Sequence, residues 1–229
     1  MKKIIGILGG MGPAATVDMF DKFVKLTDAK KDQDHIPLLI SSIPDVPDRT
    51  EAMLHGGKDP LKKLVKYMKM LEDGGAKCIV IPCNTAHYWF DKLKKRCNVH
   101  MISIVDSTLD AIKMTDAKKI GILATDATLS GGLYQKRLEK DGFKVILPKN
   151  QKDVMDGIYI FKAGDLDKAT KLVEKEVKTM FENGADLIIC GCTEIPIILK
   201  NSIDKNPEKF MDATIELVRA SIKWYKSKK

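Results

Sequence analysis

Aromatic residues are scarce in this chain: Phe, Trp and Tyr together make up 6% of its 229 residues. The net charge of +8 comes without an arginine-rich tract and without basic residues interleaved with aromatic ones. Surfaces that bind nucleic acid usually combine these two features. We therefore expect the lysines to lie on solvated helix faces, and we expect no nucleic-acid partner. A mild positive field would also suit an acidic small substrate.

Long hydrophobic runs are absent too, since no apolar stretch approaches the roughly 20 residues of a membrane span. Residues 1–3 (MKK) lead straight into an apolar segment and glycines, without the small-residue cleavage site of a signal peptide. We expect no membrane partner and a cytoplasmic protein.

Paired cysteines are the third absence. The chain has five cysteines, an odd number, and no C-x-x-C pair. This argues against a disulfide scaffold and for a reducing compartment. Cys190 and Cys192 could join Cys83 at a metal, but a structural zinc site needs four ligands, usually as spaced pairs. We predict no metal, and we assign Cys78 and Cys190 to the core.

One stretch occurs twice. Residues 75–85 (GAKCIVIPCNT) and residues 184–194 (GADLIICGCTE) align without a gap. Each copy has Gly-Ala, a short apolar run rich in β-branched residues, and then a cysteine. Such a run, without alternation, is typical of a strand buried on both faces of a parallel sheet. The pattern places Cys83 and Cys192 just past the carboxyl ends of two equivalent strands, where open α/β sheets bind ligands.

Other echoes divide the chain into two related α/β halves. Residues 5–8 and 120–123 both read IGIL, and an amphipathic helical stripe precedes each copy of the repeat. We predict two pseudo-symmetric, Rossmann-like domains with parallel sheets. The first domain spans 1–98 plus 207–229, with a returning C-terminal helix, and the second spans 99–206.

Proline and capping residues predict local boundaries. Prolines should keep 44–50 out of helix and sheet, and Asp106 with Ser107 should cap a helix over 108–114. We also expect one helix over about 129–140, and a final amphipathic helix that starts at 206–208 and includes Phe210 and Met211.

Two thiols at equivalent positions suggest a particular chemistry. Helix N–H groups near a strand-to-helix junction favour the thiolate. One such cysteine would suggest a nucleophile. A twofold-related pair can flank one substrate carbon from opposite faces, one thiolate removing a proton while the opposite thiol supplies one. That arrangement inverts a stereocentre without a redox cofactor, so we expect no cofactor.

Four segments together resemble the signatures of the aspartate/glutamate racemase family: residues 9–16 (GGMGPAAT), 47–50 (PDRT), 82–87 (PCNTAH) and 191–196 (GCTEIP). They fall in register, and the resemblance spans essentially the whole chain. It implies a cofactor-independent amino-acid racemase, usually a homodimer, with its active site in the cleft between two α/β domains. The implied reaction interconverts L- and D-enantiomers of an acidic amino acid, aspartate or also glutamate, by proton transfer between two thiols.

The same resemblance implies roles for individual residues. Cys83 and Cys192 match the family's two catalytic cysteines. Arg49 matches an arginine that grips a substrate's distal carboxylate, and Lys162 matches a second cation with that purpose. The remaining substrate-binding candidates are Met11, Asn84, Thr85, Ala86, Thr125 and Thr193. Backbone N–H groups after each cysteine would hold the α-carboxylate.

Other readings stay open. The loop after the first strand loosely fits a dinucleotide-binding G-x-G-x-x-A, but Pro13 removes a helix N–H and no acidic residue ends the second strand. An effector-binding protein on this fold would not need two thiols. Decarboxylases and isomerases of the same superfamily use one or both cysteines, and a racemase of broad specificity is a further alternative. His87 could tune Cys83 or be structural.

Overall fold

The computed structural model describes residues 2–227, so predictions that fall on Met1, Lys228 and Lys229 lie outside the described residues. By its internal contacts the chain divides into two compact units, one of Met1–Ser107 with Thr214–Lys229 and the other of Thr108–Ala213. The domain limits predicted from the sequence, after residues 98 and 206, remain a prediction.

The sheet of the first unit has four parallel strands in the order β2-β1-β3-β4. Its strands are β1 (Ile4–Leu8), β2 (Leu38–Ser41), β3 (Ala76–Val80) and β4 (His100–Ile102). In β3, Cys78, Ile79 and Val80 are fully buried. A central strand with a run of buried apolar residues matches the prediction from the first copy of the repeat.

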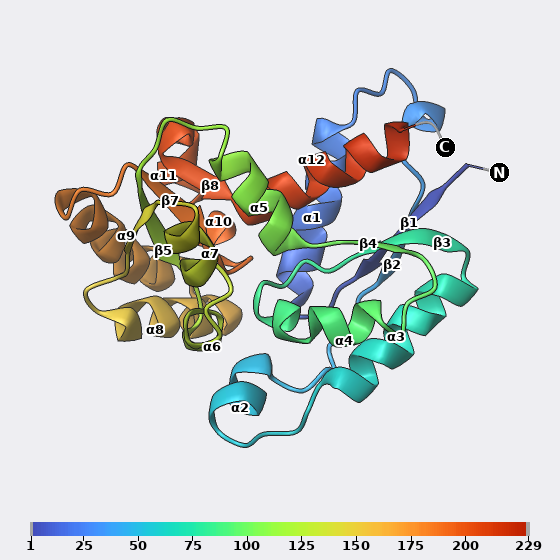
Figure 1. Ribbon diagram of the computed structural model, residues 1–229, viewed down its shortest axis with the longest axis horizontal. Coiled ribbons are helices and arrows are strands. Elements are labelled where there is room, and N and C mark those ends of the chain that lie inside the picture. The colour runs from blue at the N-terminus through green and yellow to red at the C-terminus, as the bar shows by residue number, and fades with distance from the viewer. Residues whose placement is uncertain (1, 228–229) are drawn as a thin grey trace. The chain divides into compact units, whose positions relative to one another are not determined.

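Helices cover both faces of this sheet (Figure 1). Helix α3 (Leu61–Asp73) packs on β1, β2 and β3 with α4 (Phe90–Lys94) beside it, and α1 (Pro13–Leu26) and α12 (Ala213–Lys226) lie on the opposite face. The shorter elements are η1 (Asp32–Asp34), α2 (Arg49–Leu54) and η2 (Thr85–Trp89). Helices on each face bury one apolar stripe against the sheet, as a doubly wound fold requires.

The second unit repeats this topology with the order β6-β5-β7-β8, again all parallel. Its strands are β5 (Lys119–Leu123), β6 (Lys144–Ile146), β7 (Leu187–Cys190) and β8 (Phe210–Asp212). Thus β3 and β7, which contain the two copies of the repeat, occupy the same position in their sheets. Gly75 and Gly184, which open the copies, both have positive φ (94° and 86°), a conformation that glycine adopts without strain.

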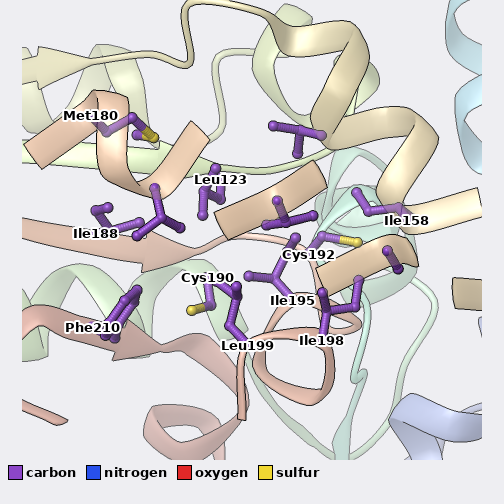
Figure 2. Close-up of a cluster of buried hydrophobic side chains, with 14 of the residues drawn as sticks. Leu123, Ile158, Met180, Ile188, Cys190, Cys192, Ile195, Ile198, Leu199 and Phe210 are labelled. Atoms are coloured by element: carbon purple, nitrogen blue, oxygen red, sulfur yellow. The ribbon is translucent and has the colours of Figure 1, made fainter. Parts of the chain in front are cut away.

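Its helices are α6 (Asp126–Ser130), α7 (Gln135–Lys140), α8 (Gln151–Lys162), α9 (Leu166–Glu182), α10 (Ile195–Ile198) and α11 (Lys200–Lys205), with η3 (Pro207–Lys209). Helix α8 packs along α9, and α9 contacts α10. Side chains from α8, α9 and α10 form one buried apolar cluster with β5 and β7, in which both Cys190 and Cys192 lie (Figure 2). This cluster fixes the strand that delivers Cys192.

Several local boundaries differ from the predictions. Helix α2 begins at Arg49, because Asp48 caps it by accepting hydrogen bonds from Thr50 N (2.7 Å) and Glu51 N (3.0 Å). Helix α5 (Ile104–Ile112) begins before Asp106, since the Ser103 hydroxyl accepts from Asp106 N at 3.1 Å and acts as the cap instead.

Two further expectations were wrong. The helix expected over 129–140 is two short helices, α6 and α7, separated at Gly131 and Gly132. Phe210 and Met211 belong to strand β8, which pairs with β7, and not to the last helix. Pairing partners distant in the sequence decide such a short strand, so helical spacing alone misassigned it.

Helix α1 has apolar residues on two faces. Ala15, Met19 and Phe23 are buried, whereas Val17, Phe20 and Val24 are exposed.

Across the described residues, no helix has the combination of length and apolar character that crossing a membrane requires.

Candidate active site

The loop after β3 presents Cys83, a buried residue whose side chain belongs to the apolar cluster of its unit. Its amide donates to the carbonyl of Ile81 at 2.8 Å, and helix η2 starts two residues later at Thr85. Asn84, Thr85 and Ala86 are all buried beside it. The thiol is therefore at a strand-to-helix junction, as predicted.

His87 connects this loop to the start of α5. Its Nδ1 lies 2.8 Å from the carbonyl oxygen of Cys83, and its Nε2 accepts from the backbone N–H of Ile104 at 3.0 Å. Since Nε2 accepts, Nδ1 carries the proton and the imidazole is neutral. Burial lowers the pKa of His87 to about 4. The ring also stacks on Phe90. Of the two interpretations, the contacts favour a structural histidine, because they hold the Cys83 backbone.

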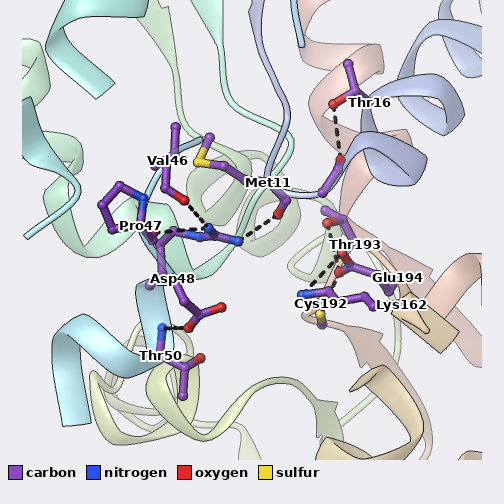
Figure 3. A network of polar contacts seen from close by, with 12 residues as sticks. Met11, Thr16, Val46, Pro47, Asp48, Thr50, Lys162, Cys192, Thr193 and Glu194 are labelled. Atoms are coloured by element: carbon purple, nitrogen blue, oxygen red, sulfur yellow. Dashed lines mark hydrogen bonds and ion pairs between the residues drawn. The ribbon is translucent and has the colours of Figure 1, made fainter. Parts of the chain in front are cut away.

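Arg49 joins two loops of the same unit (Figure 3). Its Nη1 donates to the carbonyls of Val46 (3.3 Å) and Pro47 (3.2 Å), and its Nη2 donates to the carbonyl of Met11 (3.2 Å). The residue is 9% exposed, and its Nε has no hydrogen-bond partner among the residues described. Helix α2, which begins at Arg49, contacts η2. Met11, Arg49 and the Cys83 loop are thus brought together.

The position of Met11 depends on the loop after β1. Gly10 has φ +82°, and a Cβ on it would lie 2.6 Å from the carbonyl oxygen of Ile43. The Thr16 hydroxyl accepts from Gly10 N at 2.9 Å and donates to the Gly12 carbonyl at 3.2 Å. Only glycine meets both the positive φ and the close approach, so this loop packs tightly against the loop that leads to Arg49.

The loop after β7 places a carboxylate against the second thiol. Cys192 Sγ donates to Glu194 Oε2 at 3.0 Å, and the Thr193 hydroxyl donates to the same oxygen at 3.4 Å. All three residues are buried. Lys162, at the end of α8, has its Nζ 3.7 Å from Glu194 Oε1. Burial, followed by the negative charge of Glu194, raises the pKa of the Cys192 thiol well above its ordinary value, and Lys162 opposes this shift.

The chain matches a known protein family over nearly its whole length. A family model described as Asp/Glu/Hydantoin racemase covers residues 8–220. The chain belongs to this family.

Relatives of this racemase family resemble the chain over its full length. The chain is 30% identical to the broad-specificity amino-acid racemase RacX of Bacillus subtilis (strain 168), over 97% of this chain and 98% of RacX. It is similar in structure to the Picrophilus torridus aspartate racemase, with a TM-score of 0.89, 33% identity, and 97% and 94% of the two chains covered. An aspartate racemase homologue from Pyrococcus horikoshii OT3 gives a TM-score of 0.74 and 28% identity, with 99% and 100% covered.

These comparisons confirm the resemblance stated from the four motifs and the predicted α/β class with two parallel sheets. Family membership supports an isomerase that acts on amino acids. The residues named from the resemblance remain predictions, and the structure shows only which of them lie together.

Within each unit, most of the predicted residues meet. The first unit gathers Met11, Arg49 and residues 83–86, and the second gathers Lys162, Cys192 and Thr193. Thr125 lies beside this second group, because Gly191 N donates to the carbonyl of Leu123 and Gly191 lies against Ala124. The Thr125 hydroxyl caps α6 by accepting from Thr128 N at 3.2 Å.

Sequence reasoning missed Glu194. Glu194 lies within the motif of residues 191–196, but a carboxylate two positions after a cysteine has no standard interpretation, so the motif alone predicts no role for it. The available signal was the repeat itself: the position that aligns with Glu194 in the first copy is Thr85. A difference in charge between two otherwise matching loops was the indication.

The other cysteines lie where a core role requires. Cys78 and Cys190 are fully buried within their strands. Burial raises the pKa of Cys78 to about 12 and that of Cys97 to about 11, so neither is reactive near neutral pH. Among residues 2–227, no cluster of three His, Cys, Asp or Glu side chains could hold a metal ion.

Proposed function

We propose that this protein is an amino-acid racemase that works without pyridoxal phosphate and inverts the α-carbon of an acidic amino acid. Aspartate is the first candidate substrate. Cys83 and Cys192 are the two proton-transfer groups. One observation carries the proposal: two buried thiols follow β3 and β7, strands that hold the same place in two sheets of identical order. A two-sided proton transfer accounts for such a matched pair.

The reaction begins with one cysteine as a thiolate and the other as a thiol. The thiolate takes the Cα proton from one face of the substrate, and the bonding electrons pass into the α-carboxylate. The opposite thiol then gives its proton to Cα from the other face, and the two cysteines have exchanged protonation states. Because the Cα–H is a very weak acid, N–H and hydroxyl groups of Asn84, Thr85, Ala86 and Thr193 stabilise the developing charge.

The burial and the contacts of Arg49 support an acidic substrate. Its guanidinium is almost fully buried, and within residues 2–227 no carboxylate pairs with it. A buried charge without a counter-ion is costly, and three carbonyl contacts offset only part of that cost. A substrate carboxylate would supply the missing charge and accept from Nε. Lys162 is the second cation, and its pairing with Glu194 leaves it a weaker selector.

Broad specificity is the second candidate, favoured by the full-length similarity to RacX. We also propose a homodimer in the cytoplasm. An exposed apolar stripe on α1, made of Val17, Phe20 and Val24, supports self-association, because monomers rarely leave such patches open. Sedimentation velocity would measure the oligomeric state, and a monomer at all concentrations would contradict the dimer.

The function is tested by incubating purified protein with single L- or D-amino acids in D₂O without pyridoxal phosphate. Chiral chromatography with mass spectrometry should show inversion of aspartate, with deuterium at Cα of the inverted product before it enters recovered substrate. Cys83→Ser and Cys192→Ser should each abolish inversion, since a hydroxyl is a far weaker acid than a thiol. A Cys192→Ser protein that racemises at the wild-type rate would exclude the two-thiol reaction. Binding of aspartate without turnover would instead favour an effector-binding protein.

A further inference from the structure

The most unusual group in the second unit is the carboxylate of Glu194, which is 2% exposed. Its Oε2 accepts from the Cys192 thiol at 3.0 Å and from the Thr193 hydroxyl at 3.4 Å. Its Oε1 is 3.7 Å from Lys162 Nζ and accepts no hydrogen bond from the described residues. Figure 3 shows the Cys192 thiol and the Lys162 ammonium group both lying near the Glu194 carboxylate.

Helix capping does not explain the burial of this carboxylate. Glu194 precedes α10, but its side chain makes no capping hydrogen bond, and only its backbone carbonyl receives the N–H groups of Ile197 and Ile198. Burying an ionised carboxylate costs stability unless a partner compensates. The partners of Glu194 are Cys192, which we propose to be catalytic, Thr193 and Lys162. Groups kept at such a cost are candidates for function.

Among the described residues of the first unit, no carboxylate accepts a hydrogen bond from the Cys83 thiol. Thr85 occupies the aligned position after Cys83, and the nearby ionisable residue, His87, contacts the Cys83 carbonyl and not its thiol. The two thiols therefore differ in the charge beside them, although their backbones occupy equivalent positions.

We infer that Glu194 is a positioning residue that sets the protonation state of Cys192, with Lys162 as its counter-charge. This inference rests on the proposed function. The Glu194 carboxylate, which accepts from Cys192 Sγ, holds the proton on Cys192, so that Cys192 supplies the proton and Cys83 acts as the base in the first direction. Turnover in that direction leaves Cys83 as the thiol and Cys192 as the thiolate, which is the state that the opposite direction needs. The Cys192 thiolate then removes the Cα proton of the other enantiomer while the Cys83 thiol supplies one from the opposite face, so no other reactant is needed.

The charges around Cys192 make opposite predictions for two variants. Glu194→Gln keeps the shape and removes the negative charge, so the thiol should ionise at lower pH. Lys162→Met removes the positive charge, so the thiol should ionise at higher pH. A merely structural disturbance would move both in the same direction. Glu176→Gln is the matched control, because Glu176 is equally buried in this unit but binds the Asn150 amide at 3.0 Å.

The experiment measures alkylation of the full chain by iodoacetamide from pH 6 to 11, with fragment mass spectra that separate Cys192 from Cys190. Glu194→Gln should lower the pH midpoint for Cys192 by about one unit or more, which makes alkylation below the midpoint about tenfold faster. Lys162→Met should raise it, and Glu176→Gln should leave it unchanged. Glu194→Asp, which keeps the charge, should fall between wild type and Glu194→Gln and serves if the latter folds poorly.

Activity supplies an independent measurement. The descending limb of the bell-shaped pH profile of kcat/KM should move to lower pH in Glu194→Gln by the same amount as the alkylation midpoint. An unchanged Cys192 midpoint in Glu194→Gln, or equal shifts in Glu194→Gln and Glu176→Gln, would overturn the inference. If the midpoint shifts as expected but the wild-type protein racemises no amino acid, the proposed function fails while the control of Cys192 by Glu194 stands.

Discussion

The loops that carry Cys83 and Cys192 have the same place in the fold and different surroundings. Each follows the third strand of a parallel sheet and precedes a short helix. In the first unit the ionisable neighbour, His87, holds the backbone through the Cys83 carbonyl. In the second, Glu194 contacts the thiol itself. The two loops therefore match in their place in the fold, whereas the ionisable groups beside the two cysteines differ.

The two cations differ in the same way. Arg49 is buried, with three backbone carbonyls as partners and no carboxylate among the described residues. Lys162 already lies near Glu194, and about a third of its side chain is exposed. Among the described residues, Arg49 is therefore the one of the two cations without an anionic partner, which makes it the stronger candidate for selecting an acidic substrate.

The largest expected effect tests that difference. Arg49→Ala should raise KM for aspartate by a factor equivalent to about 2–5 kcal/mol, because it removes one partner of a desolvated charge pair. Lys162→Ala should raise it less, since its charge is partly screened by solvent. Steady-state kinetics with aspartate, and with alanine as a substrate lacking the distal carboxylate, measure the effect.

Because Arg49 also ties the Met11 loop to the Val46 loop, Arg49→Ala could act through the fold. Thermal unfolding of the free protein separates the two effects, and Arg49→Lys keeps the charge while changing the carbonyl contacts. Equal KM increases for aspartate and alanine, or no increase for either, would show that Arg49 does not select the substrate.

The second comparison concerns pH and stability. His87 is buried and neutral, with its pKa lowered to about 4 from 6.5. The unfolded chain therefore binds a proton more readily between these values, so the stabilising contribution is complete above about pH 6.5 and is lost as the pH falls towards 4. Wild type should lose about 2–3 kcal/mol of unfolding free energy between pH 7 and pH 4.5 from this group alone. Urea unfolding at the two pH values measures the loss.

In His87→Asn, the free energy of unfolding should fall by about 2–3 kcal/mol less between pH 7 and pH 4.5 than in wild type. The variant should also be less stable at pH 7, because its contacts to Cys83 and Ile104 are weakened. His55→Asn, at an exposed histidine, is the control and should retain the wild-type slope. A His87→Asn protein whose stability falls as steeply as that of wild type would exclude His87 as the source of the acid sensitivity.

The strands inside the repeat could be predicted from the sequence, whereas some elements outside it could not. Apolar runs identified β3 and β7, and the cysteines that follow them, because buried parallel strands have a local signature. Strand β8 escaped detection, since three residues (FMD) become a strand only by pairing with β7. The start of α5 was misplaced because Ser103 and Ser107 are both plausible caps, and Ser103 makes the contact to Asp106.

The chemistry of the site divides along the same line. Residue type and spacing pointed to the two cysteines as candidates, whereas the contact of Glu194 with Cys192 depends on side-chain direction in the loop after β7. Likewise, the sequence placed Arg49 in a proline-rich loop, but its burial results from contacts with Met11, 38 positions away in the chain. Contacts that close long loops leave no local pattern, so they needed the structure.

The smallest expected effect concerns the loops after β1 and β5. In the first, helix α1 has no side-chain cap and Pro13 at its start; in the second, Thr125 caps α6 through its hydroxyl. Thr125→Ala should therefore lower the free energy of unfolding by about 1 kcal/mol, and Thr125→Ser, which keeps the hydroxyl, should restore most of it. Urea unfolding measures this. If capping is the only role of Thr125, KM for aspartate should stay at the wild-type value in both variants. A raised KM in Thr125→Ala that Thr125→Ser restores would instead show that the hydroxyl also binds substrate, and a stability loss without any change in KM would remove Thr125 from the predicted site.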